Sequence, residues 1–378
     1  MNRKCSSIYS FTLSGIVLSL VTLVLTGQGS AQSFVESPRV DQLREKAEHG
    51  RLKDQLELAS DYLVGKEVAR DLQQSAYWYR KAADQGEPEA QVELGYFYLA
   101  GIGVTADPAE AARWFERAAG SGSRPAKLNL AILYLWGKGV ARDQRLAFKM
   151  ITDLALQGEG RAEHYLGLMY QLGIATEKNP AVAEEWFEKA AAHHNPEGQY
   201  ALGTLFSNQP GHVHDLAKAV EQFRLSAKVG YVASMHSLGL LLVNHPELPQ
   251  SPGEAIHWLQ VGAEAGSWQS SATLGILSRD GRGMPKDPVA EYRWFQIALH
   301  QGKKPAEDFL STALKDAEAI LTVDQRSQSV EYVADWMTQH GGRDVFVFSA
   351  PGPNPFFPLN EYYAINIPSQ GTSLSLAN

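Results

Sequence analysis

The amino-acid sequence repeats every 36 residues, and this period constrains the fold more than any other feature. Glycine fills all but one position of a first column: Gly50, Gly86, Gly122, Gly158, His194, Gly230, Gly266 and Gly302. Leucine fills every position of a second column: Leu58, Leu94, Leu130, Leu166, Leu202, Leu238, Leu274 and Leu310. Columns of alanine and tryptophan that begin at Ala83 and Trp78 keep the same register. Columns in register without an insertion predict seven repeat units between residues 51 and 302.

Each unit is predicted to form two helices, and the second unit shows the pattern most fully. Apolar residues recur there at helical spacing up to Tyr98. Gly101 and Gly103 then end the first helix, because glycine adopts the left-handed conformation at little cost. Asp107-Pro108 begins the second helix, since aspartate accepts hydrogen bonds from the amides of a first turn and proline suits the first helical position. One such helix pair cannot bury its own apolar face, so the pairs are expected to stack.

The second unit reads Ala-x3-Leu-Gly-x2-Tyr-x2-Gly-x-Gly-Val, then Asp, then Ala-x2-Trp-Phe-x2-Ala-Ala. This pattern resembles the Sel1-like repeat, a relative of the tetratricopeptide repeat. The resemblance implies an all-α fold, an α-α superhelical solenoid of about seven 36-residue helix pairs over residues 51–302. It also implies a scaffold or adaptor that binds other proteins through the concave face of the superhelix, and not an enzyme.

The N-terminal segment is typical of a secretory signal. Arg3 and Lys4 precede an uncharged, mostly apolar stretch, and small residues lead up to Ala31. We expect residues 1–31 to be a signal peptide cleaved near Ala31, which predicts a periplasmic or secreted protein. The alternative is an uncleaved anchor, the one case in which a membrane association is expected. The single cysteine, Cys5, lies inside this segment, so the mature chain is predicted to hold no disulfide.

The regions that flank the repeats are predicted to close the two ends. Residues 32–50 are expected to form a lead-in helix. Residues 303–340 are expected to form two capping helices, the second opened by a capping box from Thr322 to Gln325. Residues 341–378 are rich in proline and aromatic residues, and an irregular tail is expected there.

Composition and motifs argue against several classes of function. A net charge of −8 is unfavourable for binding nucleic acid. The chain lacks the signatures of zinc proteases, phosphate loops and serine hydrolases, so no catalytic or cofactor-binding residues are assigned. His193-His194 and His212-x-His214 resemble ligand pairs, but a predicted helix of about 13 residues separates them by roughly 20 Å. No metal site is therefore predicted.

Side chains that break their own column are the best candidates for partner binding. Tyr96, Trp136 and Tyr165 are large aromatic residues on first helices, at positions where other units carry smaller or polar residues. On second helices, the column of Lys81, Arg117, Asp153 and Lys189 becomes apolar in units five to seven, at Leu225, Val261 and Ile297. Such an apolar face must be covered either by the chain's own C-terminal part or by a partner.

Two other functions remain open from the sequence. A cell-wall or β-lactam-related hydrolase on the same fold would need a clustered nucleophile and base, which the sequence does not display. A polysaccharide-assembly subunit would bind glycan through exposed aromatic side chains. Protein partners from the envelope or the secreted fraction are the leading prediction.

Overall fold

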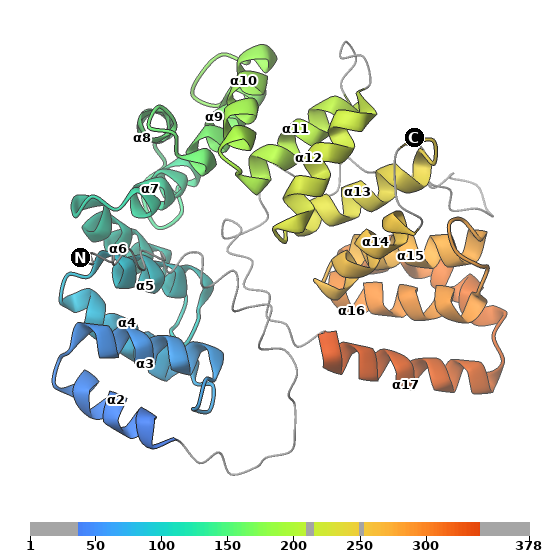
Figure 1. Cartoon of the computed structure of the whole chain (residues 1–378), viewed down its shortest axis with the longest axis horizontal. Helices are drawn as coiled ribbons and strands as arrows, with labels where there is room; N and C mark the ends of the chain where they lie inside the picture. The colour runs from blue at the N-terminus through green and yellow to red at the C-terminus, as the bar shows by residue number, and fades with distance from the viewer. Residues whose placement is uncertain (1–36, 209–214, 249–252, 341–378) are drawn as a thin grey trace, which may run out of the picture. The chain divides into compact units, whose positions relative to one another are not determined.

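The computed structural model describes residues 37–208, 215–248 and 253–340, with the side chains of 208 and 303–309 excepted (Figure 1). Every regular element in these ranges is a helix. The chain divides into two compact units, residues 1–127 and 128–378, which are described separately below. The predicted signal peptide and the predicted tail lie outside the described residues.

Consecutive helices pack against each other within each unit. The first unit contains α2 (Pro38–Glu48), α3 (Leu52–Val64), α4 (Leu72–Asp84), α5 (Pro88–Ala100) and α6 (Pro108–Gly120). Helix α7 (Arg124–Trp136) spans the division between the units. The second unit continues with α8 (Gln144–Ala155), α9 (Gly160–Leu172), α10 (Pro180–Ala192), α11 (Pro196–Asn208), α12 (Leu216–Lys228), α13 (Val232–Asn244), α14 (Glu254–Glu264), α15 (Trp268–Asp280), α16 (Pro288–Ala319) and α17 (Val323–His340). Odd-numbered helices from α3 to α15 are the first helices of the repeats, and even-numbered helices from α4 to α16 are the second, which confirms the predicted solenoid of helix pairs.

Acidic or amide side chains begin most of the second helices. The Oδ1 atom of Asp107, for example, accepts hydrogen bonds from the backbone amides of Ala109 and Glu110. Equivalent caps recur at the same register in the other repeats: Asp71, Asp143, Asn179, Asp215 and Asp287. These bonds satisfy amides that have no partner inside the helix. Ser251, the predicted cap of the sixth unit, lies outside the described residues, and α14 begins after Gly253.

Left-handed residues follow most of the repeat helices, as the glycine columns predict, whereas α13 ends at His245 with φ of −126°. First helices end at residues such as Gly101, with φ of 73°, and Gly173, with φ of 72°. The glycines that follow second helices also have positive φ, from 77° at Gly158 to 97° at Gly230. His194, the one non-glycine of that column, adopts the same conformation with φ of 57°.

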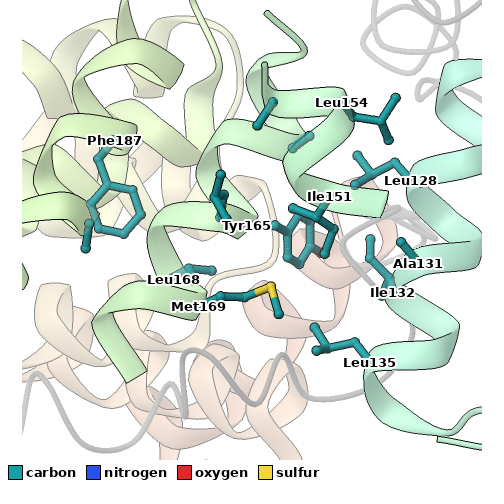
Figure 2. Packing of buried hydrophobic residues seen from close by; sticks show 14 of the residues in the cluster. Leu128, Ala131, Ile132, Leu135, Ile151, Leu154, Tyr165, Leu168, Met169 and Phe187 are labelled. Carbon is teal, nitrogen blue, oxygen red and sulfur yellow. The ribbon is translucent and has the colours of Figure 1, made fainter. Parts of the chain in front are cut away.

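In four of the repeats, the core is built on a close approach of a phenylalanine ring to a glycine. Gly167 of α9 faces Phe187 of α10, and a Cβ atom at Gly167 would lie 2.6 Å from Cε1 of that ring. Gly95 and Phe115 repeat this arrangement in the first unit. Figure 2 shows Phe187 within the cluster that α7, α8 and α9 share with it. This contact brings the two helices of a pair close together.

The C-terminal region differs from its prediction at one point. Helix α16 continues through Gly302 to Ala319, whereas the glycine column predicts a helix end at Gly302. Gly302 therefore lies in a helix interior, where glycine is tolerated at a cost. The predicted capping box is confirmed, because the backbone amide of Thr322 donates to Oε1 of Gln325 and the amide of Gln325 donates to Oγ1 of Thr322.

Candidate partner-binding surface

Tyr96 lies on α5 and is half-buried. Its ring packs edge-to-face on Phe115 of α6, with 5.5 Å between the ring centroids. Glu93, three residues earlier on the same helix, is half-buried, and its pKa is raised to about 7 by burial and then by the nearby carboxylate of Glu89. Burial and the carboxylate of Glu89 thus favour the uncharged form of Glu93, one turn before Tyr96.

Trp136 and Leu172 occupy the same position of the repeat in α7 and α9, the first helices of two consecutive repeats. Each is the last residue of its helix and precedes a glycine, Gly137 or Gly173. Trp136 is half-buried against the cluster of α7, α8 and α9, whereas the side chain of Leu172 is 46% exposed. These two positions place large apolar side chains at one end of α7 and α9. Leu172 is not among the residues chosen from the sequence, although its column of Val64, Ala100 and Trp136 already carries the signal.

Two of the predicted partner-binding residues are buried. Tyr165 is 6% exposed and lies inside the cluster that Figure 2 shows. Ile297 is fully buried, because Val333 and Trp336 of α17 pack against it. Neither side chain presents a surface to a partner in this structure, so the candidate surface excludes them.

Leu225 and Val261 lie on the second helices and remain accessible to different degrees. Leu225 is 41% exposed, and Val229, the C-cap residue directly after α12, is 50% exposed. Val261 of α14 is partly buried against the cluster of α11 to α14. The earlier repeat carries a cation at this register, where Nζ of Lys189 lies 3.8 Å from the centroid of the Trp186 ring. The change from cation to aliphatic side chain therefore exposes apolar surface on α12.

The histidines are engaged in packing and in pairs within the fold. His164 is buried beside Tyr165 and Phe187, and burial lowers its pKa to about 4. Nδ1 of His193 lies 2.7 Å from the buried carboxylate of Glu163. No group of three or more histidine, cysteine or acidic residues within the described ranges is arranged to hold a metal ion. His212 and His214 lie outside the described residues.

Comparison with known proteins gives matches along most of the chain. The Sel1 repeat family model matches residues 53–87, 88–123, 124–158, 160–195, 196–231, 232–267 and 273–303. These seven segments follow the helix pairs from α3 and α4 to α15 and α16. Within the described part of the chain, no helix is both long and apolar enough to cross a membrane.

The chain is also similar to individual proteins. The chain is 39% identical over 66 residues to the secretory immunoglobulin A-binding protein EsiB of Escherichia coli O6:H1, a match that covers 17% of this chain and only 14% of the relative's length. A Sel1 repeat protein from Oxalobacter formigenes is 27% identical, with a TM-score of 0.50 over 79% of this chain and 86% of that chain. The structure of c5321, a protective antigen of uropathogenic Escherichia coli strains, is also 27% identical and covers 81% of this chain and 73% of that chain, with a TM-score of 0.41.

Proposed function

Because the chain belongs to the Sel1 repeat family, whose members are generally protein-interaction scaffolds rather than enzymes, we propose that it is an exported scaffold that binds protein partners through its first helices. The observation that carries the proposal is the pair of apolar side chains, Trp136 and Leu172, at the ends of α7 and α9. Tyr96 of α5 is a second, separate anchor in the compact part formed by residues 1–127.

Large apolar side chains at an accessible helix end suit a protein partner. Tryptophan and tyrosine are enriched among the few residues that contribute most of the binding energy at protein interfaces, and side chains that are ordered before binding lose less entropy. Trp136 is already held against its cluster, so little conformational entropy remains to be lost when a partner covers it. A segment of a partner laid across both helix ends would bury Leu172 as well.

The test uses the mature chain in its own cells with chemical crosslinking and identification of the captured proteins. The variants are Trp136→Ala and Leu172→Ala, singly and together, and Tyr96→Ser alone. Leu156→Ala is the matched control, because Leu156 is 71% exposed but lies at the end of α8, a second helix. We expect the double variant to lose a defined set of partners that the wild-type chain and the Leu156 variant both retain.

Circular dichroism and thermal unfolding of each variant separate loss of binding from loss of fold. A folded double variant that captures the same proteins as the wild type would refute the role of Trp136 and Leu172. Specific retention of glycans by the wild type, without protein partners, would favour the polysaccharide-assembly alternative.

Export rests on the N-terminal sequence and has its own test. The apolar segment and the small residues before the expected cleavage site support it. N-terminal sequencing of the protein isolated from the envelope fraction is expected to begin at Gln32. A chain that keeps residues 1–31 would show that the segment is retained, and recovery with the cytoplasm would contradict export.

A further inference from the structure

Helices α12 and α14 share an apolar stripe formed by Leu225, Val229 and Val261. Leu225 lies in the last turn of α12, and Val229 is the C-cap residue of the same helix, four residues later. An ion pair links the two helices, because Nε of Arg224 on α12 lies 2.8 Å from Oε1 of Glu254 on α14. Val261 lies one repeat after Leu225 at the same register. We refer to these three residues as the α12–α14 stripe.

The same register is covered one repeat later by the C-terminal part of the chain. Ile297 of α16 follows Val261 by 36 residues and is fully buried beneath Val333 and Trp336 of α17. The ring of Trp336 also packs edge-to-face on Trp294, with 6.1 Å between the centroids. Residues that follow the repeats thus already cover this apolar column at its end, and the exposed part lies on the preceding second helices.

The chain continues beyond α17 with a segment of suitable composition. Residues 341–378 contain pairs of adjacent aromatic residues at Phe356-Phe357 and Tyr362-Tyr363, and only three charged residues: Arg343, Asp344 and Glu361. A segment of this length spans up to about 120 Å when extended. Packed helices lie about 10 Å apart, so the distance from α17 back to α12 is well within reach.

We propose that the segment 341–378 extends the cover made by α17 and docks on the α12–α14 stripe. Its aromatic side chains bury Leu225 and Val229, which would otherwise remain in water. The stripe lies on second helices, whereas the proposed partner surface lies on first helices, so either proposal can fail without the other.

The test uses the full-length mature protein with a photo-crosslinking amino acid, p-benzoylphenylalanine, in place of Val229. The matched control carries it in place of Leu156, an exposed leucine directly after α8 that lies outside the stripe. We expect irradiation to link position 229 to peptides from residues 341–378 of the same chain, and the control position to give no such product. Links between two chains would assign the stripe to a second copy and overturn the proposal, as would no link or equal links from both positions.

A substitution in the stripe gives a second measurement. Leu225→Lys places at this register the residue type that the wild-type chain has at Lys189. We expect chymotrypsin to cut after Phe356, Tyr362 or Tyr363 about tenfold faster in this variant, because the contact loses a buried leucine. Leu156→Lys is the control and should leave the cleavage rate unchanged. Equal rates in the wild type and the Leu225 variant would refute the docking.

Discussion

The carboxylate of Glu67 lies 2.9 Å from Nε of Arg39, and this ion pair ties α2 to the first repeat. Glu67 has a φ of 59°, a conformation that the repeat normally assigns to glycine. In the next repeat, Gly103 holds the equivalent position, and a Cβ atom there would overlap the backbone carbonyl of Leu72. At Glu67 no repeat precedes, so the side chain has space and serves to hold α2. The same position of the repeat is thus a tightly packed glycine in the second repeat and an acidic residue that binds α2 in the first repeat.

The first prediction concerns this N-terminal cap. Arg39 also contacts Asp61, whose side chain is only 4% exposed. Arg39→Ala is expected to lower the free energy of unfolding by about 2–3 kcal/mol, because a buried carboxylate loses its cation. Glu67→Gly should have a much smaller effect, since loss of an exposed ion pair is offset by relief of the left-handed backbone. Urea denaturation of both variants measures the difference, and equal losses would contradict the distinct role of Asp61.

The second prediction concerns His194, the one non-glycine in its column. Its φ of 57° is costly for a residue with a Cβ atom, and its side chain is exposed. His194→Gly is therefore expected to raise the free energy of unfolding by about 1 kcal/mol. The reciprocal control is Gly230→Ala, where a Cβ atom meets no neighbour within 4 Å, so that only backbone strain is added. That variant should lose about 1 kcal/mol. A neutral or destabilising His194→Gly substitution would disprove this account of strain.

The helix pairs and their ends follow from the sequence because the signals are local. Asp107 caps the helix that it precedes, and Gly101 ends the helix that it follows, whatever lies further along the chain. The roles of Glu67 and Ile297 depend instead on which helices lie next to them. Glu67 is accommodated because it has no preceding repeat, and Ile297 is buried because α17 follows. A comparison of equivalent positions in the repeats cannot show these neighbouring helices, because it does not show what packs against each residue.

The candidate surface was predictable in part for the same reason. Comparison within a column identifies Trp136 as unusually large, and the structure leaves it half-buried at a helix end. The same comparison selects Tyr165, which turns inward to join the cluster with Ile151. Whether a large side chain points into the core or out of it depends on packing between repeats, which the sequence alone does not reveal.

The third prediction tests the contact between Gly167 and Phe187. Gly167→Ala should lower the free energy of unfolding by about 1–3 kcal/mol, because the new Cβ atom would lie 2.6 Å from the ring. One repeat earlier, the equivalent positions hold Ala131 and Ile151, a larger residue facing a smaller one. The double variant Gly167→Ala with Phe187→Ile copies that pair. It is expected to recover part of the loss in a double-mutant cycle, and strictly additive effects would show that the two positions do not pack as a unit.

The fourth prediction concerns the pH dependence of stability through His164. Its pKa is about 4 in the folded chain, against an ordinary value of 6.5, because burial disfavours the charged ring. Between pH 6.5 and pH 4 the unfolded chain binds a proton that the folded chain does not, so stability falls as the pH falls through this window. The contribution is on the order of 3 kcal/mol. His164→Leu, which copies Leu128 of the preceding repeat, should remove this part of the slope.

Glu291 supplies a control of opposite sign for the same measurement. It is 4% exposed, at a position where the preceding repeats carry Ala219 and Ala255, and its pKa is raised to about 7, chiefly by burial. A raised pKa in an acid means that its contribution to stability is lost as the pH rises toward 7. Urea denaturation across the window from pH 4 to pH 7 should therefore show that Glu291→Ala gains stability relative to the wild type as the pH rises. His164→Leu should gain relative to the wild type as the pH falls. Parallel curves for the wild type and the His164 variant would mean that this ring is not held neutral by burial.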